Sequence, residues 1–95
     1  LLHNDDRKIV KNNIDRDKKF FLQVGVFTDA NNADKLSNKL RNIDYINYNV
    51  FIKTANLNES FLYTVKIGPI INNENVMYVQ KKLKKDEINT KVITE

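Results

Sequence analysis

The fold of this chain is decided by residues 20–27, which read FFLQVGVF. The run is apolar, rich in β-branched and aromatic residues, and of strand length. Side chains alternate along a strand, so one set is expected to face a core: Phe20, Leu22 and Val24. The set between them is expected to face the other way: Phe21, Gln23 and Gly25. The run therefore predicts a strand with one buried face.

An amphipathic helix is predicted directly after this strand. Residues 28–32 read TDANN and supply the turn and N-cap side chains with which helices begin. Apolar residues then recur at helical spacing: Ala33, Leu36, Leu40 and Ile43. The chain thus passes from a strand into a helix within a few residues.

Two further strands are predicted in the middle of the chain. Residues 48–54 form the second, and residues 55–60 are a polar turn. Residues 61–67 form the third strand, which is expected to stop at Gly68 and Pro69 because proline has no N–H for a central ladder. The short turn predicts that these two strands pair as a hairpin.

The last part of the chain predicts a second helix and a short final strand. Asn72 and Asn73 offer an N-cap, and the apolar positions that follow are Val76, Val79 and Leu83. Lysines gather near the end of this helix, where positive charge complements the helix dipole. Residues 89–94 form the final strand.

The resulting order, βαββαβ, predicts an α+β fold of the ferredoxin-like or RNP-like type. In this fold a four-stranded antiparallel sheet carries two helices on one face and leaves the other face open. An internal repeat supports it, because a displacement of 43 positions superposes corresponding residues of the two halves: Gly25 on Gly68, Ala33 on Val76, Leu36 on Val79 and Leu40 on Leu83.

Length and composition fit one small domain preceded by a linker. The chain has 95 residues, of which 41% are hydrophobic and 29% charged, so it is expected to fold around a modest core. Residues 1–17 are polar without a clear period and predict a flexible linker or arm, and residues 18–95 are the domain. The formal net charge of +4 lies in the second segment. It indicates either an anionic partner or simple solubility.

The reactive side chains argue against an enzyme. There is no cysteine, and the one histidine, His3, lies in the predicted linker. A Ser-His-Asp triad or a histidine zinc site needs a histidine inside the fold. The carboxylates fall in predicted caps, turns and exposed faces. No catalytic residue, metal or cofactor is therefore expected, and no apolar run is long enough for insertion into a membrane.

The sequence contains two strand motifs, and each is followed by a predicted helix. The first is FLQVGVF at residues 21–27, followed by Asn32 and Ala33 and by helical residues 36–40. The second is YTVKIGPI at residues 63–70. Over residues 18–94 the chain resembles the SPOR (sporulation-related repeat) domain family, whose members typically read aromatic-x-Val-Gln-Val-Gly-Ser-Phe in the first strand and Tyr-x-Val-x-x-Gly-Pro-Phe in the third.

The resemblance implies a function as well as the βαββαβ fold. SPOR domains bind bacterial peptidoglycan, preferably glycan strands without stem peptides, and target their parent proteins to the division septum. A monomer in the periplasm or cell envelope is therefore expected, without nucleic acid as a partner. The layout of a linker followed by a terminal domain resembles envelope proteins such as amidases and lytic transglycosylases. A parent of the rare lipoprotein A type is expected.

The resemblance also implies a glycan site on the open face of the sheet. It includes Gln23, whose amide both donates and accepts hydrogen bonds. The family's serine is replaced by Val26, and its aromatic and basic positions in the third strand are Leu62 and Thr64. Three further residues complete the predicted site: Phe21 and Lys66 by strand alternation, and Val92 by its family position. For Val92 the apolar pattern alone favours core packing instead.

Two other functions fit the same architecture. One is a protein-interaction or oligomerisation domain of ferredoxin-like fold, with Phe21, Leu62 and Val92 in the interface. The other is an RRM-type RNA-binding module, which stacks bases on aromatic side chains of its third strand. Residues 61–67 lack the glycines of that motif and direct Leu62, Thr64 and Lys66 outward, so the sequence favours the glycan hypothesis.

Overall fold

A computed structural model describes residues 18–94; the predicted linker, residues 1–17, and Glu95 lie outside the described residues. The elements follow in the predicted order: β1 (Lys19–Phe27), α2 (Ala30–Arg41), β2 (Val50–Leu57), β3 (Ser60–Ile71), α3 (Asn73–Lys85) and β4 (Lys91–Thr94). The predicted α+β class with βαββαβ order is confirmed.

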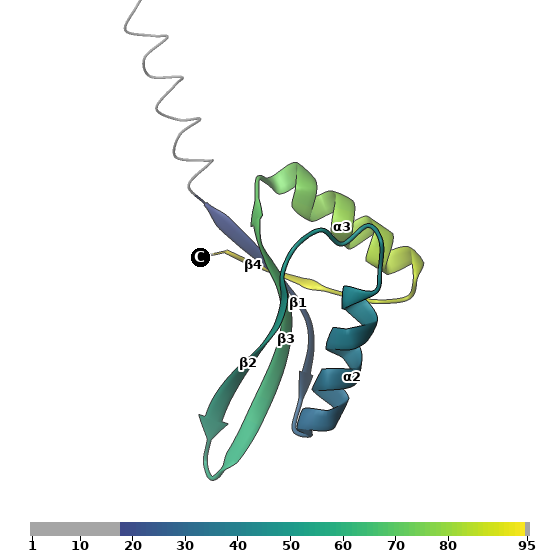
Figure 1. Cartoon of the computed structure of the whole chain (residues 1–95). Coiled ribbons are helices and arrows are strands. Elements are labelled where there is room, and N and C mark those ends of the chain that lie inside the picture. The colour runs from purple at the N-terminus through teal and green to yellow at the C-terminus, as the bar shows by residue number, and fades with distance from the viewer. Residues whose placement is uncertain (1–17, 95) are drawn as a thin grey trace, which may run out of the picture.

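The four strands form one sheet in the order β2-β3-β1-β4, and each neighbouring pair is antiparallel. Both helices pack on the same side of this sheet (Figure 1). The two strands in the middle, β3 and β1, are therefore paired on both edges, while β2 and β4 are the edge strands. The side without helices is open.

The core lies between the sheet and the two helices. Its members from the strands and the connecting loop are Leu22, Ile46, Val50, Val65, Ile67 and Ile70. Its members from the helices are Ala33, Leu40, Val76, Val79 and Leu83. Burying a Val, Leu or Ile side chain contributes about 1.5–3 kcal/mol. The helical residues include both halves of the predicted repeat, so the repeat reflects two equivalent strand-to-helix packings.

Each helix begins at a capping side chain that the sequence predicts. Oδ1 of Asp29 accepts a hydrogen bond from the backbone N–H of Asn31 at 2.8 Å. Oδ1 of Asn72 accepts one from the backbone N–H of Asn75 at 2.9 Å. These bonds satisfy N–H groups that have no partner within the helix. Both helices begin before their first apolar position, because the cap and not the apolar period sets the first turn.

The third strand does not stop at Gly68 and Pro69 as predicted. It continues to Ile71, and the pairing with β1 resumes at Ile70, opposite Phe20. A register shift accommodates the additional residue at this point. Pro69 is tolerated there because β2 begins opposite Ile67 and leaves no ladder partner beyond it.

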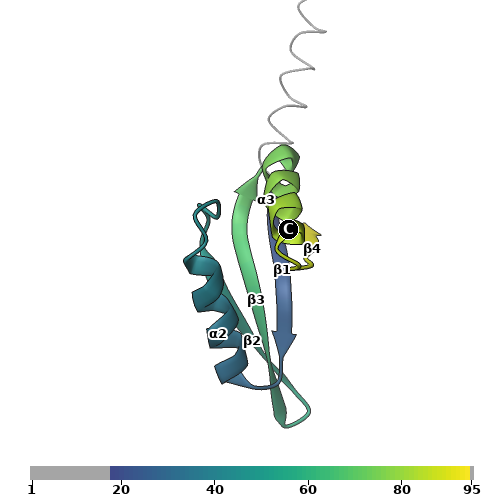
Figure 2. The ribbon, with the colours of Figure 1, turned by 90° about the vertical axis from the view of Figure 1, so that its right-hand side faces the viewer.

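The β2–β3 hairpin is longer than predicted. The second strand extends to Leu57, so the turn is reduced to Asn58 and Glu59, whose φ angles are 50° and 70°. Two positive φ angles in a two-residue loop are the signature of a type I′ turn, whose twist matches that of the strands. The hairpin projects beyond the N-terminal end of α2 (Figure 2).

A hydrogen bond between two distant loops joins the helical layer at one end. The hydroxyl of Tyr45, between α2 and β2, donates to Oδ2 of Asp86, the residue after α3, at 2.8 Å. Burial, this hydrogen bond and the negative charge of Asp86 raise the pKa of Tyr45 to about 12. The protonated phenol is thus favoured in the folded state, above its ordinary pKa of about 10.

Replacing Tyr45 by phenylalanine is expected to lower the free energy of unfolding near pH 7 by about 1 kcal/mol. Because the folded pKa is the higher one, the contribution of the hydroxyl is complete below about pH 10 and is lost as the pH rises toward about 12. Urea denaturation of both proteins across this range should show the difference between them shrinking. Tyr78→Phe, at an exposed position of α3, is the control. A constant difference at every pH would contradict the assignment.

Candidate ligand-binding face

The side of the sheet turned away from α2 and α3 is here called the open face. Residues directly opposite each other on paired antiparallel strands point to the same side, so the strand register assigns its members. They include Phe21, Gln23 and Val26 of β1, Phe51, Lys53 and Ala55 of β2, Leu62, Thr64 and Lys66 of β3, and Lys91 and Ile93 of β4.

One row of the open face crosses all four strands. Lys66 pairs with Phe51 of β2 on one side and with Gln23 of β1 on the other. Gln23 in turn pairs with Lys91 of β4. Directly opposed side chains have Cβ atoms about 5 Å apart, so the amide of Gln23 lies between two lysines. The row can present an amide donor and acceptor together with two positive charges to one ligand.

One aromatic ring, that of Phe51, belongs to this row, and a second, that of Phe21, lies beside it. The centroids of Phe21 and Phe51 are 5.9 Å apart with the rings at 83°, an edge-to-face contact. Phe21 also lies against Gly68, where a Cβ atom would be 2.7 Å from Cδ2 of the ring. Lys66 is only 8% exposed although no helix covers it, so neighbouring side chains cover its aliphatic stem. This part of the face is therefore apolar and rigid around a positively charged group.

A bulge in β1 makes the observed alternation differ from the predicted one. The register against β3 shifts between Gln23 and Gly25, which places Gly25 opposite the core residue Val65. A Cβ atom on Gly25 would lie 3.0 Å from Cδ2 of Leu36 on α2, so this position faces the helices and not the open face. An additional residue reverses the alternation beyond it. As a result Val26, which is 47% exposed, joins Gln23 on the open face.

The three predicted positions of the third strand lie together on the open face. Thr64 pairs with Val26 on one side and with Lys53 on the other. Leu62 pairs with Ala55 nearer the tip of the hairpin. With Lys66, these residues form a continuous column along β3, as strand alternation predicts.

Val92 is the exception among the predicted site residues. It pairs with Leu22, which is completely buried under the helices, so Val92 points to the helix side of the sheet. The prediction that it lines the open face with the others is therefore wrong. The positions of β4 that do lie on the open face are its neighbours, Lys91 and Ile93.

Five of the open-face members named above were missed in the sequence: Phe51, Lys53, Ala55, Lys91 and Ile93. Lys91 and Ile93 depend on the register of β4, which no local pattern indicates. Phe51 and Lys53 are signalled by alternation within the second strand, since Val50 is buried between β2 and the helices. Applying that alternation would have placed the second aromatic ring and a third lysine on this face.

The charge of the open face has one sign. Its positions include Lys53, Lys66 and Lys91, and among the described residues none of its positions is Asp or Glu. Lysine donates charge-assisted hydrogen bonds to carboxylates. The exposed apolar side chains beside these lysines can pack against an uncharged ring of a ligand. The face thus suits an extended ligand that has acidic, amide and apolar parts.

The described part of the chain contains no candidate metal site. Within residues 18–94 no three metal-ligating side chains are grouped so that they could hold an ion. The helices of this same segment are too short or too polar to cross a membrane.

The comparisons with known proteins agree with this geometry. The SPOR domain family matches residues 17–94. The crystal structure of the RlpA SPOR domain from Pseudomonas aeruginosa is similar with a TM-score of 0.71 and 27% sequence identity, covering 78% of this chain and 96% of that one. The peptidoglycan-binding domain of the B. subtilis cell wall lytic enzyme CwlC shares the fold, with a TM-score of 0.57, 21% identity and coverage of 82% and 90%. A search of the curated proteins found no match. By its motifs, fold and family match, this chain belongs to the SPOR domain family.

Proposed function

We propose that the open face binds peptidoglycan of the bacterial cell wall, without catalysis by this chain. The observation that carries the proposal is the row in which Gln23 lies between Lys66 and Lys91, on a face without helices. The family match and the peptidoglycan-binding domain of CwlC support the same ligand. The domain would act in the periplasm or cell envelope and bring its parent protein to the division septum.

Glycan strands without stem peptides are the preferred ligand in this proposal. The amide of Gln23 suits the N-acetyl and hydroxyl groups of a sugar, because it can donate and accept at once. Removal of the stem peptide leaves the lactyl group of each muramic acid as a free carboxylate. Lys66 and Lys91 would bind such carboxylates, while Phe21 and Leu62 cover apolar faces of the sugar rings.

The charge of the open face also supports a monomer. In a symmetric dimer formed through this face, Lys53, Lys66 and Lys91 would meet the same residues of a second copy. Like charges in such an interface repel and lose solvation. The charge thus favours an anionic ligand over the alternative of self-association through the sheet.

Replacing Gln23 by alanine is expected to weaken binding about fivefold to thirtyfold, since one or two hydrogen bonds of about 1 kcal/mol each are lost. The measurement is co-sedimentation with purified sacculi, before and after an amidase has removed the stem peptides. The unsubstituted domain should pellet more strongly with the amidase-treated material.

Asn31→Ala is the matched control, because this exposed amide lies on α2, away from the open face. It should bind like the unsubstituted domain. Failure of the folded domain to pellet with either material would overturn the proposed ligand. Equal binding by the Gln23 variant would remove Gln23 from the site.

A further inference from the structure

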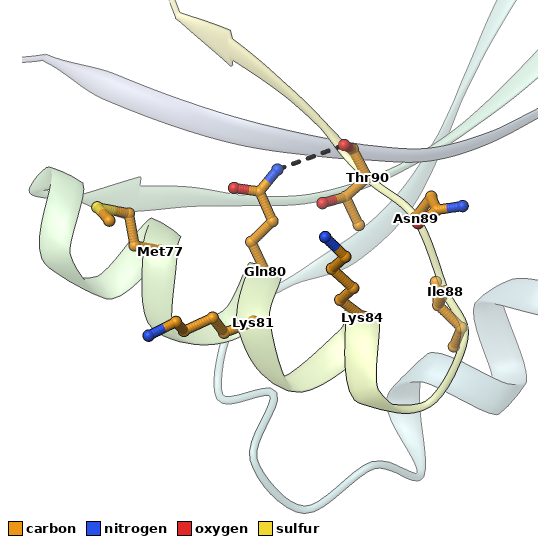
Figure 3. Close-up of a pocket in the computed structure, with 7 residues that line it drawn as sticks. All are labelled: Met77, Gln80, Lys81, Lys84, Ile88, Asn89 and Thr90. Carbon is orange, nitrogen blue, oxygen red and sulfur yellow. Dashed lines mark hydrogen bonds between the residues drawn. The ribbon is translucent and has the colours of Figure 1, made fainter.

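A pocket of about 340 Å³ lies on the other side of the molecule from the open face, between α3 and the segment that leads into β4. It is lined by Met77, Gln80, Lys81, Lys84, Ile88, Asn89 and Thr90. Figure 3 shows Gln80, Lys84 and Thr90 pointing toward one another, with Met77 and Ile88 at opposite ends. The pocket is thus built by one helix and one connecting segment.

The charged residues that line this pocket are all positive. Two of its seven lining residues are lysines, Lys81 and Lys84, and none is acidic. Nε2 of Gln80 donates to the backbone carbonyl of Thr90 at 3.3 Å, which holds the amide in place and leaves its oxygen free to accept. The hydroxyl of Thr90 is buried and has no hydrogen-bond partner among the described residues.

The unpartnered hydroxyl is unusual, because buried polar atoms nearly always have a hydrogen-bond partner. The two lysines favour a ligand that carries negative charge. Met77 and Ile88 require an apolar group, because they form the ends of the pocket.

We propose that this pocket binds the carboxyl-terminal residue of a peptide that ends in an aliphatic side chain. Its carboxylate accepts hydrogen bonds from Lys81 and Lys84. Its backbone N–H donates to the oxygen of Gln80, and its side chain packs against Met77 or Ile88. Inorganic phosphate meets only the first of these requirements, since it has no apolar group.

The test compares two peptides that differ only in their terminal charge, acetyl-Ala-Leu and acetyl-Ala-Leu-amide. Binding is followed by the amide shifts of the domain in ¹H–¹⁵N NMR titrations. The acid is expected to bind with a dissociation constant on the order of 1 mM, shifting residues 77–90, and the amide at least about fivefold more weakly. Salt should weaken the acid and leave the amide unchanged.

Two variants connect this binding to the pocket. The double variant Lys81→Gln/Lys84→Gln should remove the preference for the acid, whereas Lys35→Gln/Lys39→Gln on α2 makes the same charge change and should retain it.

Equal binding of acid and amide would overturn the proposal. So would absence of shifts at about 10 mM peptide, or equal acid binding by the two double variants. Sacculus binding is an independent readout, because none of the substituted lysines lies on the open face.

Discussion

Replacing Gly68 by alanine is expected to destabilise the domain by about 3 kcal/mol or more, because two separate penalties apply. Its φ of 148° lies where residues with a Cβ atom are rarely found. The new Cβ atom would lie 2.7 Å from Cδ2 of Phe21 and 2.9 Å from the backbone oxygen of Phe20. A domain of this size has a total stability of about 4–11 kcal/mol. Urea denaturation should therefore detect a large loss, together with a fall in melting temperature.

Gly25→Ala is the matched comparison for this prediction. Its Cβ atom would also meet close neighbours, at 2.9 Å from Cε2 of Phe27 and 3.0 Å from Cδ2 of Leu36. These atoms belong to side chains that can move, and no positive φ is required at this position. The loss at Gly25 should be the smaller one, about 1–2 kcal/mol. If Gly25→Ala were the more damaging change, backbone conformation would not be what requires glycine at Gly68.

Charge reversal on the open face is expected to reduce peptidoglycan binding more than about tenfold. The variant is Lys53→Glu/Lys91→Glu, which changes two exposed lysines and leaves the less accessible Lys66 in place. The proposed contact of Lys91 with a ligand carboxylate becomes repulsive, and Lys53→Glu adds a second negative charge to the face. A charge-assisted hydrogen bond contributes about 1.5–3 kcal/mol. The measurement is co-sedimentation with amidase-treated sacculi at low and high salt. The loss should be largest at low salt, where screening is weakest.

The control for this variant is Lys35→Glu/Lys39→Glu, which makes the same change of net charge on α2. If binding depends on the particular lysines of the open face, the control should retain most of it. An equal loss in both variants would mean that overall positive charge, and not this face, attracts the wall. Circular dichroism of both proteins would verify that they remain folded.

Local patterns in the sequence predicted the elements of this fold and much of their packing. Alternation identified Leu22 as a core residue, and Asp29 and Asn72 were within the predicted cap segments. The helical spacing identified Ala33 and Leu83 as buried. These features depend on neighbours within one or two turns of the chain, so a single sequence contains the information for them.

The departures from prediction arise where one strand meets another. The bulge before Gly25 and the shift opposite Gly68 depend on the pairing of β1 with β3, which joins residues some 40 positions apart. The same pairing moves Val26 onto the open face, and the pairing of β1 with β4 removes Val92 from it. Strict alternation cannot anticipate an added residue, since a bulge reverses every position that follows it. The candidate site was therefore predicted in its residue types more completely than in its geometry.

Because β4 is an edge strand, the residues that it contributes to the open face are expected to be more mobile than those of the central strands. Gln23 and Lys66 belong to strands whose backbones are paired on both sides, so their amides should exchange with solvent deuterium mainly through global unfolding. Lys91 belongs to a strand of four residues that is paired on one side only. Such a strand opens locally at little energetic expense. One lysine beside Gln23 is therefore held in a fixed place, while the other can follow a ligand that varies in shape along its length.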